Sequence, residues 1–192
     1  EKINGWQQIV PVSGWRSLKE QQDIFKQSLK DNGRTFTQQF VALPGKSEHQ
    51  TGLAIDLGLK KESIDFIRPD FPYIGICQQF REKSVPYGFI ERYPREKEHI
   101  TGIAHEPWHF RYVGTPHAEI MREHHFCLEE YIDFLKRFSQ DQPYTFYKDS
   151  QEIQIFYLKA DTESVSLEVA EDGSLSVSGN NVDGYIITEW RG

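Results

Sequence analysis

The pattern of the sequence changes near Asp141, and this change is the strongest constraint on what the chain can fold into. Beyond it, short runs of alternating residues are separated by turn sequences such as EDG and NNVDG, which is typical of antiparallel hairpins. The expected strands are YTFYK, IQIFYLKA, VSLEVA, SLSVSG and GYIITEW. We therefore predict that residues 141–192 form a small antiparallel β appendage of four or five strands.

Residues 1–140 mix helices and strands instead. Ser17, with Glu20 three residues later, has the capping-box pattern that starts a helix, and DNG at 31–33 is expected to end it. In chain order, we expect the end of a helix at 1–8, a strand at 9–15, a helix at 17–33, a strand at 53–59, a helix within 71–84, strands at 86–94 and 106–114, and a helix at about 117–138. Because no regular βαβ repeat appears, the expected fold class is α+β.

Composition narrows the class of protein. The 192 residues suffice for one domain or one domain plus a small appendage, and 22 basic against 29 acidic residues argue against a nucleic-acid binder. The chain has neither the roughly 20 continuous apolar residues of a membrane span nor the pattern of a signal peptide. We therefore expect a soluble chain without a membrane segment. Two cysteines, Cys77 and Cys127, fit a reducing compartment or simple core packing better than a disulfide framework.

The stretch SEHQTGLAID (47–56) places a histidine and an aspartate seven positions apart around a glycine. In a straight strand this offset sends the two side chains to opposite faces, so His49 and Asp56 converge only if the chain turns between them. Gly52 makes such a turn plausible. An aspartate in an otherwise apolar strand needs a partner. A metal ion and a hydrogen-bonded or arginine-paired carboxylate are equally good readings of this fragment.

A second fragment, HEPWHF (105–110), carries a glutamate and a histidine three positions apart in an extended, aromatic run. Pro107 disfavours helical geometry at Glu106, and a regular strand separates positions three apart, so a local bulge or bend is required for Glu106 and His109 to reach one site. Taken alone, the fragment favours a strand with Glu106 facing solvent and His109 packed beside Trp108.

Together, the two fragments supply two imidazoles, one ligand carboxylate and one spare glutamate. Catalytic zinc sites use this set: three protein ligands, an open position for water, and a carboxylate base outside the metal shell. Other divalent ions can occupy such a site as well. The sequence has no HExxH motif, so a thermolysin-like arrangement is excluded.

Three motifs carry a resemblance to a known family. SEHQTGLAID matches the pattern SxHxxGxAxD, EPWHF follows some fifty residues later with ExxH, and SGWRSLKEQ is similar to SGYRSxxxQ with Trp15 in place of tyrosine. The chain thus resembles the VanY- and VanXY-type zinc D,D-peptidases of the LAS group (lysostaphin, D-Ala-D-Ala peptidase, hedgehog) over residues 10 to 138. The resemblance implies a hedgehog/D-Ala-D-Ala peptidase-like core at 1–140, with a central antiparallel sheet flanked by helices, and leaves the appendage unexplained.

The resemblance also assigns roles. It implies three ligands to one zinc ion per chain: His49, Asp56 and His109. Glu106 would be the catalytic base, and Arg16 would stabilise the oxyanion, where a fixed charge has its largest effect. Ser47 and Gln21 would hold the substrate's terminal D-alanine through its carboxylate.

Three of these residues also have interpretations without a functional role. Arg16 would then be a surface guanidinium, Gln21 a helix-surface amide and Ser47 a turn residue. Trp108 would be core or pocket wall. His105, the neighbour of Glu106 on an extended chain, is expected to point away from the site.

The implied activity is hydrolysis of the D-Ala-D-Ala dipeptide, removal of the C-terminal D-Ala of peptidoglycan precursors, or both, which would contribute to vancomycin resistance. Alternatives are an L,D-carboxypeptidase or cell-wall endopeptidase on the same scaffold, and a zinc-containing binding module without catalysis. A partner or dimer contact through the appendage is a further possibility.

A VanXY-type enzyme would be cytoplasmic, and VanY-type relatives are membrane anchored with the catalytic domain outside. We expect a cytoplasmic location, with the extracellular face as the alternative if an N-terminal anchor is missing. The family core has more chain before SGYRS than the 12 residues present here, so we expect an incomplete N-terminus.

Overall fold

The computed structural model describes residues 5–160, 164, 167 and 173–191. Its contacts divide the chain into two compact units, the first ending at Cys127 and the second beginning at Leu128. This division places helix α5 (Leu128–Leu135) with the second unit, where it contacts strand β6 (Gln151–Lys159). No helix in the described part of the chain combines the length and the apolar character needed to cross a membrane.

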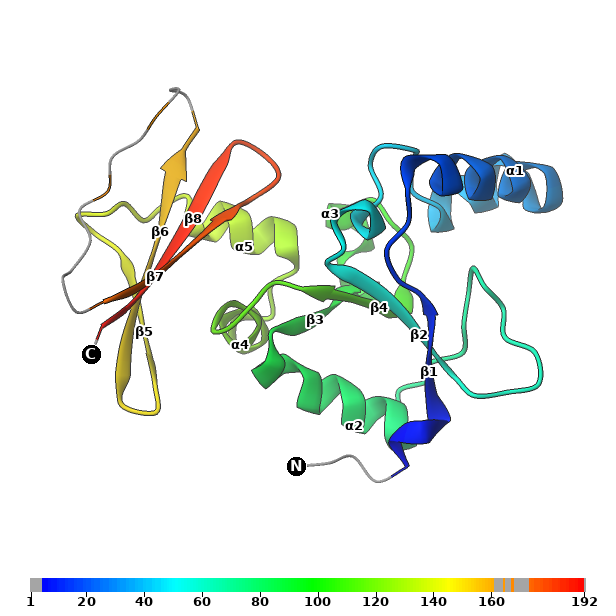
Figure 1. Cartoon of the computed structure of the whole chain (residues 1–192), viewed down its shortest axis with the longest axis horizontal. Helices are drawn as coiled ribbons and strands as arrows, with labels where there is room; N and C mark the ends of the chain where they lie inside the picture. Colours follow the sequence, from blue (N-terminus) through cyan, green and yellow to red (C-terminus); the bar gives the residue numbers. More distant parts are fainter. Residues whose placement is uncertain (1–4, 161–163, 165–166, 168–172, 192) are drawn as a thin grey trace. The chain divides into compact units, whose positions relative to one another are not determined.

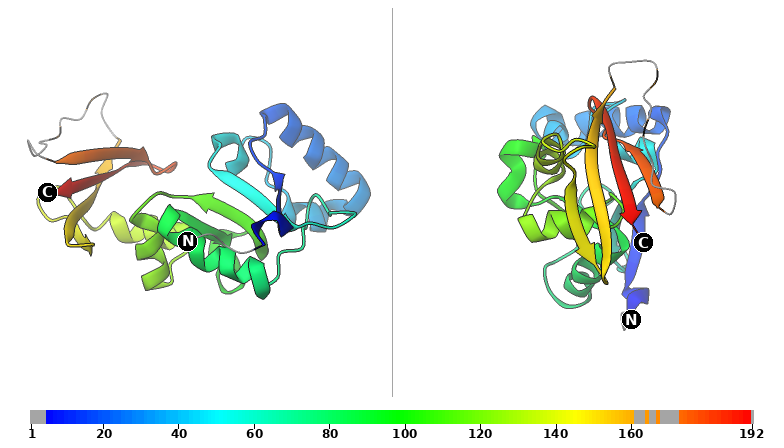
Figure 2. Two further views of the ribbon diagram at one scale, coloured as in Figure 1. Left: turned by 60° about the horizontal axis from the view of Figure 1, so that its bottom comes forward. Right: turned by 90° about the vertical axis from the view of Figure 1, so that its left-hand side faces the viewer.

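Within residues 5–127, the first unit contains one sheet, four α-helices and four short 3₁₀-helices. In chain order they are η1 (Trp6–Gln8), β1 (Ile9–Ser13), α1 (Leu18–Phe40), η2 (Glu48–Thr51), β2 (Ala54–Leu59), α2 (Gly75–Ser84), η3 (Val85–Tyr87), β3 (Phe89–Tyr93), η4 (Arg95–Lys97), α3 (Glu98–Thr101), β4 (Glu106–Tyr112) and α4 (His117–His124). The strand order is β1-β2-β4-β3, and every neighbouring pair is antiparallel. Helix α2 covers one face of this sheet and α1 lies on its other side (Figures 1 and 2).

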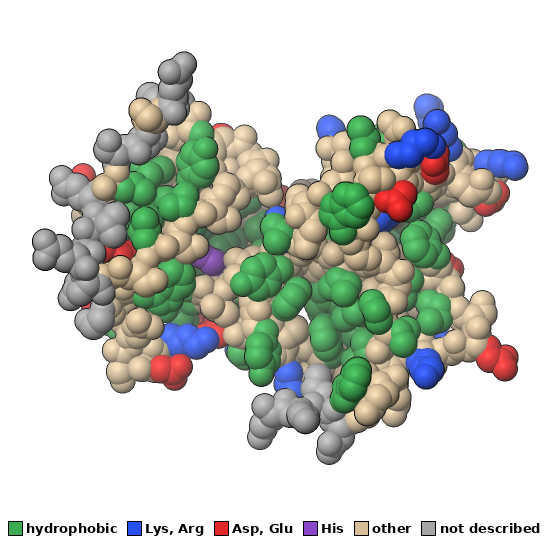
Figure 3. All heavy atoms as spheres, viewed as in Figure 1, with side chains coloured by type: hydrophobic (Ala, Val, Ile, Leu, Met, Phe, Trp, Pro, Cys, Tyr) green, Lys and Arg blue, Asp and Glu red, His purple; other side chains and the backbone are tan. Residues whose placement is uncertain are grey.

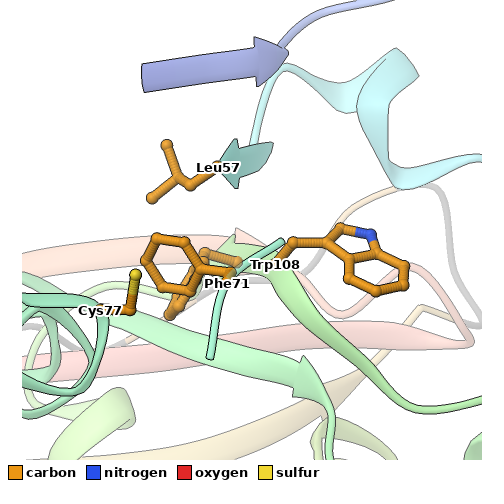
Figure 4. Packing of buried hydrophobic residues seen from close by; sticks show 5 residues of the cluster. Leu57, Phe71, Cys77 and Trp108 are labelled. Carbon is orange, nitrogen blue, oxygen red and sulfur yellow. The ribbon is translucent and has the colours of Figure 1, made fainter. Parts of the chain in front are cut away.

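The apolar core of the first unit lies between α2 and the sheet. Leu57 of β2 and Phe110 of β4 meet Cys77 of α2, and Phe71 and Trp108 complete the cluster (Figure 4). The side chain of Cys77 is fully enclosed, which fits the core packing expected for it. Burying such side chains supplies the main stabilisation of the unit.

The opposite face of the same strands is polar. Asp56 precedes Leu57, and His109 precedes Phe110. Because successive side chains of a strand point to opposite faces, the pattern that sends Leu57 and Phe110 into the core sends Asp56 and His109 to the other side of the sheet. The α+β fold with a central antiparallel sheet is therefore confirmed, and it creates a polar face opposite the core.

Helix α1 starts where it was predicted, and it is kinked where its end was predicted. Ser17 accepts a hydrogen bond from the Glu20 amide, and the Glu20 carboxylate accepts one from the Ser17 amide, so the capping box is present. The predicted end at DNG is confirmed as an interruption: Gly33 leaves the helical conformation with φ 78° and ψ 175°, and a second helical stretch that was not predicted follows the kink to Phe40. The exposed part of α1 carries charged side chains of both signs (Figure 3).

Two other helix predictions need correction. The helix expected at 117–138 is interrupted, because His125 adopts the left-handed conformation with φ 56° after α4, and α5 (Leu128–Leu135) begins beyond it. The helix end expected at 1–8 is only the 3₁₀ turn η1, and residues 1–4 lie outside those described.

In the residues that the structure describes, the second unit comprises helix α5 and a four-stranded antiparallel sheet. Its strands are β5 (Tyr144–Lys148), β6 (Gln151–Lys159), β7 (Ser174–Gly179) and β8 (Gly184–Arg191), in the order β5-β6-β8-β7. Ile153, Ile155 and Ile187 are among its buried apolar side chains. The predicted β character is confirmed for these strands, and the strand expected at VSLEVA (165–170) lies outside the described residues apart from Leu167.

Candidate metal centre and active site

Three predicted ligand residues meet on the polar face of the first sheet. His49 lies in η2, Asp56 in β2 and His109 in β4, and one potential ligand atom from each lies within 4.8 Å of the others. All three side chains are buried, with exposed fractions of 7% or less. The structure thus brings together two imidazoles and a carboxylate that are 60 residues apart at their extremes (49 to 109).

A glycine turn produces the convergence of the first two residues. Gly52 takes φ 75°, a conformation that other residues rarely adopt, and its amide donates a hydrogen bond to the His49 carbonyl. The chain therefore reverses between η2 and β2, and His49 Nε2 comes to 3.2 Å from Asp56 Oδ2. The turn predicted around Gly52 is confirmed.

Strand register brings in the third residue. Asp56 lies directly opposite His109 in the antiparallel pair of β2 and β4. Directly opposed residues share a face of the sheet, and His109 Nδ1 lies 2.8 Å from Asp56 Oδ1. Asp56 therefore stands between the two imidazoles.

A bulge in β4 brings Glu106 to the same site. Along β3, Glu91 pairs with Phe110 and Tyr93 pairs with Glu106, so two steps on β3 correspond to four steps on β4. The extra residues shift the pleat of β4. Glu106 Oε2 consequently lies 3.8 Å from His109 Nδ1. The bulge that the sequence required is confirmed, and the reading in which Glu106 faces solvent is wrong, because Glu106 is buried.

The His49 ring is oriented so that one nitrogen can bind a cation. His49 Nδ1 donates to the Gly14 carbonyl at 2.7 Å, which leaves Nε2 directed toward the site. This Nε2 is buried and makes no hydrogen bond within the described chain. In metal sites the outer nitrogen of a ligating histidine typically donates to a carbonyl or carboxylate, which fixes the ring and its tautomer. His49 Nε2, an Asp56 carboxylate oxygen and His109 Nδ1 could hold a divalent metal ion.

Glu48 is a site residue that the sequence reasoning missed. Its Oε2 lies 3.5 Å from His109 Nε2, and its Oε1 contacts Arg92 Nε at 2.7 Å and Arg111 Nη1 at 3.1 Å. Burial alone would raise the pKa of Glu48, but the hydrogen bond with His109 and the charges of the two arginines hold the pKa well below its usual value. Glu48 therefore remains ionised and orients the His109 ring.

Glu106 has a different electrostatic environment. Burial raises the pKa of Glu106 to about 8, and the negative charges of Asp56 and Glu48 act in the same direction, against the opposing charges of His109 and Arg16. A carboxyl whose pKa is close to neutral can both accept and return a proton, as a general base and acid must.

Arg16 lies beside this group rather than on the surface. Its Nη2 is 3.7 Å from Asp56 Oδ2, and its backbone amide donates to the His49 carbonyl at 3.3 Å. Burial lowers the pKa of Arg16, and the nearby carboxylates of Asp56 and Glu106 oppose that effect. A partly desolvated guanidinium at a fixed position is suited to stabilising negative charge.

The site opens into a pocket that Ser47 and Gln21 also line. Both side chains are buried, so the reading of Gln21 as a helix-surface amide is wrong. Ser47 does stand at a turn, since it directly precedes η2 and its carbonyl accepts from the Gln50 amide. Gln21 Nε2 donates to the Ala42 carbonyl at 2.8 Å, and its Oε1 is buried without a hydrogen-bond partner in the described chain. Trp108 belongs to the core cluster and also forms part of the pocket wall.

His105 behaves as the alternation of an extended chain predicts. It lines a separate cavity with Tyr73 and Glu91, and its ring stacks on Tyr73. The active-site pocket is lined by its neighbour Glu106 instead.

Comparisons with known proteins agree with this geometry. Residues 3–115 match the VanY family, described as D-alanyl-D-alanine carboxypeptidase. The chain is 54% identical over 125 residues to the bifunctional D-Ala-D-Ala dipeptidase and carboxypeptidase VanXYC of Enterococcus gallinarum, covering 65% of this chain and 66% of that protein. It is 36% identical to a D-alanyl-D-alanine carboxypeptidase of Enterococcus faecium, over 98% of this chain and 56% of the relative. The chain thus spans between half and two thirds of the length of these curated relatives.

Solved structures extend the likeness. The D,D-dipeptidase VanXYg, in complex with a D-Ala-D-Ala phosphinate analogue, matches 98% of this chain and 76% of its own with a TM-score of 0.96 and 56% identity. A zinc-bound variant of the D,D-pentapeptidase VanY matches 65% of this chain and 71% of its own, with a TM-score of 0.55 and 34% identity. The L,D-carboxypeptidase LdcB matches 66% of this chain and 58% of its own, with a TM-score of 0.57 and 37% identity. The chain belongs to the VanY family of D-alanyl-D-alanine carboxypeptidases.

Proposed function

We propose that this chain is a zinc D,D-peptidase that hydrolyses the D-Ala-D-Ala dipeptide, removes the C-terminal D-Ala of peptidoglycan precursors, or does both. One observation carries the proposal: a buried His-Asp-His group, a glutamate with a raised pKa and a partly buried arginine line the same pocket. The named activities of VanXYC and VanXYg support it.

The proposed metal is one zinc ion per chain. His49, Asp56 and His109 would hold it, and this nitrogen and oxygen donor set is one that zinc accepts. The buried, unbonded Nε2 of His49 is the feature that a cation at this position would satisfy. When bound, zinc would polarise the scissile carbonyl and make a water molecule more acidic.

Each remaining residue has a defined task in the proposed reaction. The Glu106 carboxylate takes a proton from the attacking water and returns it to the nitrogen of the leaving D-alanine. The Arg16 guanidinium donates hydrogen bonds to the oxygen that becomes negative when the carbonyl is attacked. Glu48 keeps His109 in the orientation that leaves Nδ1 facing the site.

Ser47 and Gln21 are proposed to hold the terminal D-alanine. Both are buried, and both line the pocket with the ligand residues. The hydroxyl of Ser47 and the amide of Gln21 would contact the substrate carboxylate or the adjacent peptide group. Apolar side chains also line the pocket, among them Ile24, Phe40 and Ile103, and such a surface suits the methyl side chain of D-alanine.

The decisive experiment measures D-alanine release from D-Ala-D-Ala and from a pentapeptide precursor, with the zinc content determined in parallel. We expect the native chain to cleave at least one substrate, and Glu106→Gln to keep its zinc while kcat falls by about 10²–10⁴. A native protein that binds zinc yet releases D-alanine from neither substrate would disprove the D,D-peptidase assignment.

The alternative activity is that of an L,D-carboxypeptidase, and the likeness to LdcB is the observation that favours it. The two activities differ in the configuration of the residue before the scissile bond. Comparing D-Ala-D-Ala with L-Ala-D-Ala at equal concentrations therefore separates them: a D,D-peptidase cleaves the first, and an L,D-enzyme cleaves the second.

Depletion of D-Ala-D-Ala termini would remove the target of glycopeptide antibiotics, so we propose a contribution to vancomycin resistance. A cytoplasmic location and a dimer contact through the β appendage stay predictions. Light scattering of the full chain over a range of concentrations tests the dimer contact: a mass above 22.5 kDa that grows with concentration supports it.

A further inference from the structure

The bulge of β4 allows Glu106 and His109 to share one site. Its backbone needs hydrogen-bond partners to keep this irregular shape. A regular ladder would continue the pairing of Glu91 with Phe110 and place Trp108, rather than Glu106, opposite Tyr93. Bulges leave backbone groups outside the ladder. The backbone carbonyls of the bulge therefore need hydrogen-bond donors from outside the ladder.

Arg81 of α2 donates a hydrogen bond to the backbone of the bulge. Its Nη2 donates to the Pro107 carbonyl at 2.8 Å, and Pro107 is the residue next to Glu106 inside the bulge. The same guanidinium donates to the Phe71 carbonyl at 2.6 Å and to the Pro72 carbonyl at 2.8 Å. Arg81 therefore ties the bulge to the segment that leads into α2.

The guanidinium is itself held firmly. Its Nε donates to Glu91 Oε2 at 2.7 Å, and the ring of Tyr73 lies 3.9 Å from its central carbon. Arg81 is only 9% exposed. Because a guanidinium is planar and carries five N–H groups in fixed directions, its position follows from these bonds.

A second contact holds the other neighbour of Glu106. Tyr73 hydrogen bonds to the other carboxylate oxygen of Glu91, and it also contacts His105 Nε2 at 2.7 Å. Arg81 and Tyr73 thus meet at Glu91, and they reach Pro107 and His105 respectively. The residues on both sides of Glu106 are bound to this cluster, which lies outside the active-site pocket.

We propose that Arg81 is a positioning residue for the catalytic base. By holding the Pro107 carbonyl, Arg81 keeps the bulge of β4 in the shape that directs the Glu106 carboxylate into the pocket. This role rests on the proposed D,D-peptidase function. It makes Arg81 act through Glu106 without touching the substrate.

The chemistry of the site explains why arginine is required. Lysine at this position would keep the positive charge but cannot reach three carbonyls and a carboxylate with one ammonium group. Methionine would keep much of the stem and leave the Pro107 carbonyl without its donor. A displacement of about 1 Å at a catalytic group can cost about 100-fold in rate, so a modest movement of the bulge is enough to be measured.

The test compares Arg81→Lys and Arg81→Met with Cys77→Ala. Cys77 is one turn earlier on α2 and faces the apolar core, so Cys77→Ala weakens the packing of the same helix without removing a bond to the bulge. For each variant we measure kcat, KM, zinc content, melting temperature and the crystal structure.

We expect both Arg81 variants to lower kcat by about 100-fold with KM and zinc content unchanged. Their structures should show the Glu106 carboxylate moved from its position 3.8 Å from His109 Nδ1. Cys77→Ala should lower the melting temperature and keep the native kcat. A purely structural Arg81 would give the reverse: a lower melting temperature, an unmoved Glu106 and a kcat equal to that of Cys77→Ala.

The crystal structures separate this proposal from the proposed function. If the native chain cleaves neither substrate, the D,D-peptidase assignment fails, and the displacement of Glu106 in Arg81→Met still decides whether Arg81 positions it. If Glu106 keeps its place in both Arg81 variants, the positioning role is wrong whatever the activity of the native chain.

Discussion

The two sheets of this protein are both four-stranded and antiparallel, yet they differ in regularity. In the second unit, β6 and β8 pair without interruption from Glu152 opposite Arg191 to Lys159 opposite Gly184. In the first unit, the register shifts twice, between Pro11 and Ser13 of β1 and between Glu91 and Tyr93 of β3. The two shifts lie opposite Asp56 and next to Glu106, respectively.

The difference shows what irregular pairing does in this family fold. A regular ladder keeps every side chain on the face that its position in the sequence dictates. A bulge changes that face locally, which lets residues three apart reach a common site. The pairing of the first sheet is therefore irregular next to the proposed site residues Asp56 and Glu106. The pairing of the second sheet is regular throughout its described strands.

Buried charge follows the same division. The first unit encloses carboxylates, imidazoles and guanidiniums around the pocket, all held by one another. The second unit encloses the carboxylate of Glu189, which contacts Arg191 at 3.0 Å, beside the apolar positions of its sheet. We therefore expect charge changes to affect activity in the first unit and to affect only stability in the second.

The largest effect is expected from Asp56→Asn. The neutral amide removes the ligand charge that stands between His49 and His109, so zinc content and D-alanine release should both fall to background. The matched variant in the second unit is Glu189→Gln, which also neutralises a buried carboxylate and should keep zinc and kcat. Equal activity of the two variants would refute the division drawn between the sheets.

A core truncation in the regular sheet should give the next largest effect. Ile187 is fully buried, and Ile187→Ala is expected to lower the free energy of unfolding by about 2–5 kcal/mol, because it removes packed methyl groups and leaves a cavity. Urea unfolding followed by circular dichroism measures the loss. Below the unfolding transition, kcat should equal that of the native chain, and a lower kcat there would link the second sheet to catalysis.

Glu48→Gln is expected to have a smaller effect on the metal site of the first sheet than Asp56→Asn. The amide keeps the shape of Glu48 but removes the negative charge that faces Arg92, Arg111 and His109. We expect zinc affinity to fall by about 10–100-fold, measured by competition with a chelating dye. Unchanged affinity would mean that His109 is oriented without Glu48.

The sequence predicted much of this arrangement because the relevant signals are local. The capping box at Ser17, the turn at Gly52 and the apolar pattern of β2 depend on neighbouring residues, and all three are present in the structure. The need for a bulge between Glu106 and His109 was also readable, since strand alternation alone separates them.

The parts that were missed depend on contacts between distant segments. Glu48 meets Arg92 across 44 residues, and Arg81 meets Pro107 across 26, so no local spacing marks either pair. The glycine at 33 does interrupt the helix, as glycine commonly does. The helical stretch after it was not predicted, although its contact to the kink is local: the Thr37 hydroxyl donates to the Gly33 carbonyl.

Ser17→Ala should have the smallest effect. Ser17 caps α1 and directly follows Arg16, so this variant tests whether the start of the helix influences the site. The Ser17 hydroxyl accepts the Glu20 amide at the start of α1, and its loss should lower the free energy of unfolding by about 1 kcal/mol. Arg16 is the preceding residue, but its amide is fixed by the His49 carbonyl. We therefore expect kcat to stay native in both Ser17→Ala and the cap-preserving Ser17→Asp, with only the alanine variant losing stability. If kcat falls in Ser17→Ala and recovers in Ser17→Asp, the start of α1 helps to place the Arg16 guanidinium, and the helix joins the two bulges in shaping the site.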